Sequence, residues 1–143
     1  MATPRLRYLT LEFGEHDIHL RMLRDRQQFD IDDASKAELL GVSPSSWPLF
    51  GVVWDSGIVL ADLMLDFDIR GKRILEVGCG LGLSSLLLNQ RYADITATDY
   101  NPSSGEFLAA NVGLNQGALI PFVCTGWEDD TSTLGTFDLI IGS

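Results

Sequence analysis

Residues 74–82 read Ile-Leu-Glu-Val-Gly-Cys-Gly-Leu-Gly, and residues 94–99 read Asp-Ile-Thr-Ala-Thr-Asp. Both stretches have the pattern of a strand; the first runs into a glycine turn, and the second ends on the carboxylate of Asp99. Glycines have no Cβ atom, so the backbone can turn tightly and a ligand can approach it closely. A strand-end carboxylate about twenty residues further on can accept both hydroxyls of a ribose. The two stretches therefore predict a nucleoside-binding site at the carboxyl edge of a parallel sheet.

The spacing of the glycines indicates which kind of nucleoside binds. Dinucleotide-binding folds use G-x-G-x-x-G, whereas this turn has Gly78, Gly80 and Gly82 followed by Leu83. Glu76 precedes the turn by two residues and would place a second carboxylate near the ligand. A carboxylate there is unfavourable for a pyrophosphate and suits a cationic amino-acid end. An NAD-dependent oxidoreductase is therefore disfavoured.

The composition is that of one folded domain. The chain has 143 residues, of which 45% are hydrophobic and 9% aromatic, enough for a single core. No apolar run reaches the roughly 18–20 residues that a membrane helix needs, and no secretory signal is visible. We interpret the two cysteines, Cys79 and Cys124, as reduced structural thiols. A cytoplasmic protein without a membrane partner is therefore expected.

The charge of the chain bears on its partners. The formal net charge is −10, from 20 acidic and 10 basic residues, and such a surface repels phosphate backbones, so we expect no nucleic-acid partner. An acidic surface would attract a basic substrate such as a lysine-bearing protein, although it can also serve only solubility. The only histidines, His16 and His19, have no cysteines or clustered carboxylates at ligand spacing, so no metal site is expected.

The N-terminal region predicts a β-hairpin. Residues 8–13 alternate apolar and polar side chains with period two, and so do residues 18–22. Gly14 and Glu15 lie between the two runs, at the position of a turn. We therefore expect an appendage ahead of the core and not a separate domain.

A linker is predicted between the hairpin and the core. A short helix at 33–40 interrupts an otherwise poorly patterned loop, and Gly, Ser and Pro mark residues 41–48 as a linker or turn. The predicted organisation is an N-terminal hairpin and linker extension at 1–48, followed by the core at 49–143.

The core predicts alternating helices and strands. Asp55 or Ser56 can cap a first helix, whose apolar positions include Ile58, Val59, Leu63 and Phe67. Further along, strands are predicted at 73–77, 94–98, 118–124 and 137–141, and helices at 82–91 and 102–114. Alternation with short connections predicts an α/β fold with a parallel sheet and right-handed crossovers.

From Trp54 to Ser143 the sequence resembles the class I, seven-β-strand S-adenosylmethionine (SAM)-dependent methyltransferases. Within that class it resembles the methyltransferase-like group of protein-lysine methyltransferases. The resemblance lies in the tryptophan before the first helix, E-V-G-C-G-L-G at 76–82, D-Y-N-P at 99–102, G-W-E at 126–128 and F-D-L-I-I-G-S at 137–143. It implies a Rossmann-like sheet, and the hairpin resembles the N-terminal extension of the group.

The resemblance also implies how SAM is held. Trp54 would line the methionine side, although it can equally be a core aromatic, and Asp99 would hold the ribose hydroxyls. Trp127 would flank the adenine, unless it is a surface aromatic that packs on its own strand. Ser143 would border the methyl-transfer centre. The predicted cofactor-binding residues are Trp54, Glu76, Gly78, Cys79, Gly80, Gly82, Asp99, Trp127 and Ser143.

The activity implied by the resemblance is transfer of a methyl group from SAM to a protein lysine amine. A small-molecule N-methyltransferase and a non-catalytic SAM-fold binding module are the alternatives, and no residue of the chain is identified as a general base. A full fold of this class has seven strands, whereas the sequence predicts four in the core. We therefore expect a fragment, or a chain completed by another, with an open apolar edge at 137–141. We also expect that it binds SAM weakly and does not turn over by itself.

Overall fold

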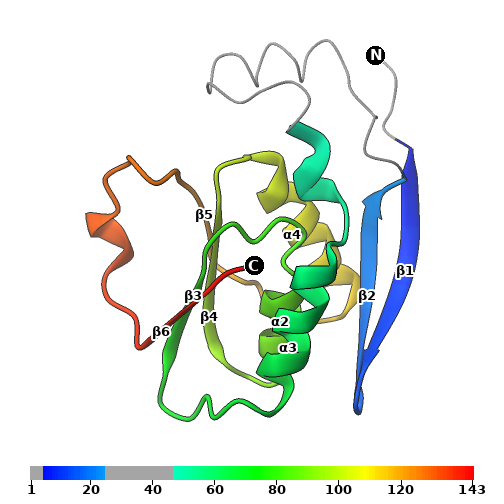
Figure 1. Ribbon diagram of the computed structural model, residues 1–143, viewed down its shortest axis with the longest axis horizontal. Helices are drawn as coiled ribbons and strands as arrows, with labels where there is room; N and C mark the ends of the chain where they lie inside the picture. The colour runs from blue at the N-terminus through cyan, green and yellow to red at the C-terminus, as the bar shows by residue number, and fades with distance from the viewer. Residues whose placement is uncertain (1–4, 25–46) are drawn as a thin grey trace.

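A layer of helices lies between a parallel sheet and an antiparallel hairpin (Figure 1). This computed structural model describes residues 5–24 and 47–143. The predicted short helix at 33–40 and most of the predicted linker at 41–48 lie outside the described residues. None of the helices in the described ranges has the length and apolar character needed to cross a membrane.

The central sheet is parallel, as the alternation of elements predicts. Its strands are β3 (Arg73–Glu76), β4 (Asp94–Asp99), β5 (Phe122–Cys124) and β6 (Leu139–Ile141), in the order β5-β4-β3-β6. The third strand is shorter than the predicted 118–124, and Pro121, which has no N–H to donate to a ladder, directly precedes it. Strand β6 forms one edge of the described sheet, and Ile140 on it is exposed. The predicted Rossmann-like fold class is confirmed.

Three α-helices cover one side of this sheet: α2 (Asp55–Asp66), α3 (Leu83–Gln90) and α4 (Ser103–Leu114). Helix α3 contributes most to the interior, because all six residues from Leu83 to Leu88 are buried. Two short 3₁₀ turns, η1 (Trp47–Gly51) and η2 (Ser132–Leu134), complete the secondary structure of the described residues.

The start of α2 differs from the prediction. The capping position belongs to Trp54, whose backbone is extended, and no side chain caps the helix, so the predicted cap by Asp55 or Ser56 is wrong. Helix α2 also presents its apolar residues on two sides. Val59 and Leu63 are exposed, whereas the buried positions are Ala61 and Met64.

The predicted hairpin is confirmed, with strands β1 (Leu6–Phe13) and β2 (His16–Leu23) paired in the register Phe13↔His16. Gly14 has φ +58°, a left-handed conformation that favours glycine. Strand β2 buries Ile18, Leu20 and Met22, whose side chains belong to the hydrophobic core. The hairpin therefore packs on the helix layer instead of standing free.

Two asparagines, Asn111 of α4 and Asn115 at the C-terminal cap of this helix, fix the hairpin in place. The N–H of Arg21 donates to Asn111 Oδ1 at 2.6 Å, and Asn111 Nδ2 donates to the carbonyl of Arg21 at 3.1 Å. Asn115 makes the same pair of bonds to His19, at 2.8 and 2.7 Å. Two residues of strand span roughly 6.6 Å and four residues of helix roughly 6.0 Å, so the two spacings match. This match specifies one register of the hairpin on α4.

Candidate cofactor site

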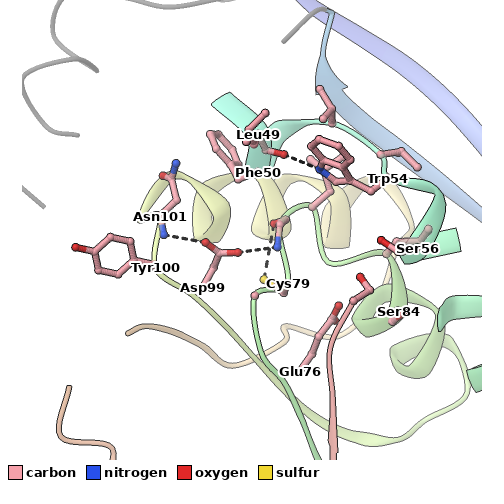
Figure 2. A pocket seen from close by; sticks show the side chains of 18 residues that line it. Leu49, Phe50, Trp54, Ser56, Glu76, Cys79, Ser84, Asp99, Tyr100 and Asn101 are labelled. Carbon is pink, nitrogen blue, oxygen red and sulfur yellow. Dashed lines mark hydrogen bonds between the residues drawn. The ribbon is translucent and has the colours of Figure 1, made fainter. Parts of the chain in front are cut away.

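A cavity of about 410 Å³ opens at the carboxyl ends of β3 and β4 (Figure 2). Its volume lies within the range that small-molecule and cofactor sites usually have. Three segments supply most of its lining: a wall at 49–54, the glycine turn at 78–81 and the strand-end residues 99–101. The two sequence stretches that predict the site are therefore brought together around one cavity.

The glycine turn runs through three left-handed residues, Gly78, Gly80 and Gly82, with φ of +60°, +54° and +75°. Gly78 and Gly80 line the cavity, whereas Gly82 precedes α3 and does not. A Cβ at Gly80 would lie 3.2 Å from the carbonyl oxygen of Phe50, and one at Gly82 would lie 2.6 Å from Leu108. The turn therefore needs glycine both for its conformation and for close packing against its neighbours.

The carboxylate of Asp99 is held by backbone donors. The N–H of Gly80 donates to Asp99 Oδ2 at 2.8 Å, and the N–H of Asn101 donates to Asp99 Oδ1 at 2.8 Å (Figure 2). An ionised carboxylate has about four lone-pair positions, so each oxygen keeps capacity to accept a further hydrogen bond. Asp99 lines the cavity and can accept two hydroxyl groups there.

Glu76 supplies a second, buried carboxylate. Its side chain is 4% exposed, and Oε2 accepts hydrogen bonds from the N–H of Ser85, at 3.0 Å, and from the Ser85 hydroxyl. Burial raises the pKa of Glu76 to about 7, the Ser85 hydrogen bonds oppose this rise, and the charge of Asp99 adds to it. Glu76 also lines the cavity, where a bound cation would favour its ionised form.

The thiol of Cys79 is not poised for chemistry. Cys79 is buried, and its Sγ lies 3.7 Å from the carbonyl of Gly80, to which it donates. Burial, together with the charges of Glu76 and Asp99, raises the pKa of Cys79 far above its usual range, so the group stays a neutral thiol. Cys124 is exposed, and neither cysteine forms a disulfide. Within residues 5–24 and 47–143, no group of three or more His, Cys, Asp or Glu side chains is arranged to hold a metal ion.

Trp54 and Ser143 close the other sides of the cavity. The indole Nε1–H of Trp54 donates to the carbonyl of Leu49 at 3.0 Å, which ties the two ends of the wall together. Ser143 lines the cavity beside the start of α2, where a Cβ on Gly57 would lie 3.8 Å from its Oγ.

Two of the predicted cofactor residues, Gly82 and Trp127, do not line the cavity. Trp127 is 89% exposed. It lies in a tight turn in which the N–H of Gly126 donates to a carboxylate oxygen of Asp129 at 2.6 Å. The other predicted residues all line the cavity: Trp54, Glu76, Gly78, Cys79, Gly80, Asp99 and Ser143.

The structure adds cavity residues that the predicted set omits, among them Phe50, Ser84 and Asn101. Asn101 follows Asp99 by two residues, so its place just past the end of a strand was a usable signal. Ser84 lies in the first turn of the helix that follows the glycine turn, which is a second usable signal. Phe50 comes to the cavity through long-range packing, which no local pattern reveals.

A parallel α/β sheet whose glycine turn and strand-end carboxylate share a cavity is a Rossmann-like fold, and the G-x-G-x-G spacing of the turn is that of class I methyltransferases. The fold is similar to that of a solved T. thermophilus 16S rRNA N2 methyltransferase, RsmC, with a TM-score of 0.58. That likeness covers 99% of this chain and 33% of the other at 15% sequence identity, so it concerns the fold alone.

Sequence comparison identifies the family. Residues 48–143 match the family described as lysine methyltransferase, and the chain belongs to this family. It is 34% identical over 108 residues to protein N-lysine methyltransferase METTL21A of Danio rerio, which covers 68% of this chain and 49% of the relative. It is 31% identical to EEF1A lysine methyltransferase 3 of Mus musculus, covering 64% and 41%. The chain thus spans about half the length of the curated relatives it matches.

Proposed function

We propose that this protein binds SAM in the cavity at the ends of β3 and β4 and transfers its methyl group to a protein lysine amine. The observation that carries the proposal is the hydrogen bond between Asp99 and the N–H of Gly80, which joins the strand-end carboxylate to the glycine turn across one cavity. Family membership and the lysine-methyltransferase names of the relatives support the lysine acceptor.

The chemical groups around the cavity fit the parts of SAM. Asp99 has acceptor capacity left for the two ribose hydroxyls. A Cβ added at Gly78 would meet nothing within 4 Å, so the turn leaves open space where a ligand can contact the backbone. Glu76 is a buried carboxylate without a cationic partner among its hydrogen bonds, which suits the ammonium group of the methionine end.

Methyl transfer mainly requires that the protein position the acceptor amine relative to SAM. SAM, when bound, supplies a methyl group that is already activated by its sulfonium. The chain must hold the acceptor amine in line with the donor and exclude water, and such positioning is worth roughly 7–11 kcal/mol. An amine with an ordinary pKa near 10.4 must also lose a proton, and burial beside apolar groups lowers that pKa. Phe50, Trp54 and Tyr100 supply aromatic surface along the cavity for this purpose.

The charge and the thiols support the choice of partner and compartment. We propose a basic protein acceptor over a nucleic acid, because the net charge of −10 attracts lysine-rich surfaces and repels phosphate. Cys79 and Cys124 are unpaired, which fits the reducing environment of the cytoplasm.

Two measurements test the proposal. Calorimetric titration of the 143-residue chain with SAM and with S-adenosylhomocysteine should show binding that Asp99→Asn weakens; the exposed Asp62→Asn serves as control. Transfer is then tested with a longer protein, extended to the length of the curated relatives, which is incubated with methyl-labelled SAM and a cell extract. Label recovered as methyllysine after hydrolysis of the protein fraction supports the lysine acceptor.

The other outcomes separate the alternatives. Label found only in molecules that pass a small-pore filter would favour a small-molecule N-methyltransferase. Binding of SAM without any transfer by the longer protein would favour a binding module. No binding of either ligand would remove the assignment of SAM to the cavity.

A further inference from the structure

The cavity wall at 49–54 is held from behind by the hairpin. A Cβ added at Gly51 would lie 2.5 Å from Leu23 Cδ1, so the leucine side chain occupies the space directly against the wall. Phe50, in the same wall, meets Phe107 of α4 edge to face, with ring centroids 5.3 Å apart and planes at 79°. The wall is therefore packed between the end of β2 and the first half of α4.

The same packing reaches the glycine turn. Leu81 of the turn belongs to one buried cluster with Leu23, Val52 and Phe107. The carbonyl oxygen of Phe50 also lies 3.2 Å from the position that a Cβ would take on Gly80. The cluster thus joins two sides of the cavity, the wall and the turn, although no hairpin residue lines the cavity itself.

The hairpin has its own anchor on α4. Asn111, which is fully buried, binds both main-chain groups of Arg21. The guanidinium carbon of Arg21 lies 5.3 Å from the centroid of the Phe107 ring, a cation–π distance. Leu23 follows two residues later, so the anchored strand delivers it to the wall in one fixed position.

We propose that Leu23 and Phe107 are positioning residues, which hold the 49–54 wall against the glycine turn and thereby set the affinity of the cavity for its cofactor. The effect of these residues on cofactor affinity rests on the proposed function, whereas their effect on the position of the wall does not. Both residues act through Phe50 and Leu81, which line the cavity, whereas Leu23 and Phe107 do not line it themselves.

The test compares matched leucine deletions on β2. Leu23 and Leu20 are both buried, but Leu20 belongs to the main core and not to the cluster behind the wall. The measured quantity is the amide hydrogen-exchange rate of residues 50–54 divided by the exchange rate of β4. Dividing by the rate of β4 corrects for any change in global stability. Leu23→Ala should raise this ratio about tenfold, and Leu20→Ala should leave it within about twofold of the native protein.

A rescue pair separates positioning from general damage. Gly51→Ala introduces a methyl group that collides with Leu23 and should also raise the exchange ratio about tenfold. Combining Gly51→Ala with Leu23→Ala gives the methyl group the space that the leucine vacates. The double variant should return to within about threefold of the native ratio, because contacting residues couple. Across all four variants, the dissociation constant for S-adenosylhomocysteine should rise where the exchange ratio rises and stay near the native value where the ratio does.

The outcomes decide the proposal separately from the proposed function. An equal rise of the ratio in Leu20→Ala, or a double variant no better than Gly51→Ala, would overturn the positioning role. If the exchange ratios behave as expected but the affinities do not follow them, the control of affinity by the hairpin is wrong. If the native chain binds no SAM at all, the proposed function fails, and the exchange ratios still decide whether the hairpin holds the wall.

Discussion

Replacing Glu76 with glutamine should stabilise the fold at alkaline pH while it weakens the cavity's hold on a cationic ligand. Glutamine keeps an oxygen that can accept the hydrogen bonds of Ser85, but it has no charge to bury. In the native protein the carboxylate is 4% exposed and has no cation among its hydrogen-bond partners. Ionising it in the folded state therefore costs free energy.

The magnitude follows from the shift of the pKa. Burial raises the pKa of Glu76 from 4.5 to about 7 in the folded protein. A folded-state pKa above the unfolded value favours folding below pH 4.5, and this contribution is lost as the pH rises through 7. At about 1.4 kcal/mol per pKa unit, the loss amounts to roughly 3 kcal/mol at pH 8. The advantage of Glu76→Gln over the native protein should therefore grow by about 2–3 kcal/mol between pH 5 and pH 8.

Urea unfolding at several pH values measures this difference. Other titrating groups are present in both proteins, so subtracting one stability curve from the other isolates Glu76. Glu12→Gln, at an exposed position on β1, is the matched control, because it removes a carboxylate that is not buried. A difference for Glu76→Gln that stays flat with pH would refute the reasoning, and so would a Glu76→Gln variant that is less stable than the native protein at pH 8.

Three further changes test the turn, the strand end and the hairpin anchor. Gly80→Ala should lower the free energy of unfolding by roughly 1–2 kcal/mol in thermal unfolding, because Gly80 has a left-handed φ. The control Gly113→Ala lies in a helix, where the added Cβ meets no neighbouring atom, and should be neutral or stabilising by about 1 kcal/mol. Equal effects of the two substitutions would contradict the role of the left-handed turn. Asp99→Asn should raise the calorimetric dissociation constant for SAM by about 10–100-fold through weaker ribose bonds; an unchanged constant would place the ribose elsewhere. Asn111→Ala should lower the free energy of unfolding, measured with urea, by about 2–3 kcal/mol, and by more than Asn115→Ala does, because Asn111 is fully buried. A larger loss for Asn115→Ala would be inconsistent with Asn111 as the main anchor of the hairpin.

The sequence predicts those parts of the site that depend on local chain geometry. Gly78 and Gly80 are in a turn that only glycine adopts easily, and Asp99 ends a strand adjacent to it, so a spacing rule suffices to place all three. The hairpin is also local, because a period-two pattern around Gly14 fixes its register.

What the sequence does not predict depends on packing between distant segments. Phe50 lines the cavity because it packs on Phe107, more than fifty residues later in the chain. Residues Val59 and Leu63 look like core positions of a helix, yet the face of α2 that packs inward carries Ala61 and Met64. Trp127 follows a strand end just as Tyr100 does, but only Tyr100 lines the cavity, because the turn at Gly126 leaves Trp127 in solvent.

The conformation of Asp99 shows how the cavity can bind a ligand with little rearrangement. Its carboxylate bridges the N–H groups of Gly80 and Asn101, so these hydrogen bonds of the chain itself fix the glycine turn and the start of α4 relative to each other. A site that its own hydrogen bonds hold in place loses less conformational freedom when a ligand binds. Glu76 has the opposite effect, because its burial makes the ionised carboxylate unfavourable and so destabilises the site as the pH rises through neutral. A cationic group that enters beside Glu76 relieves this cost, and the affinity for SAM should therefore rise between pH 5 and pH 7, as Glu76 becomes ionised.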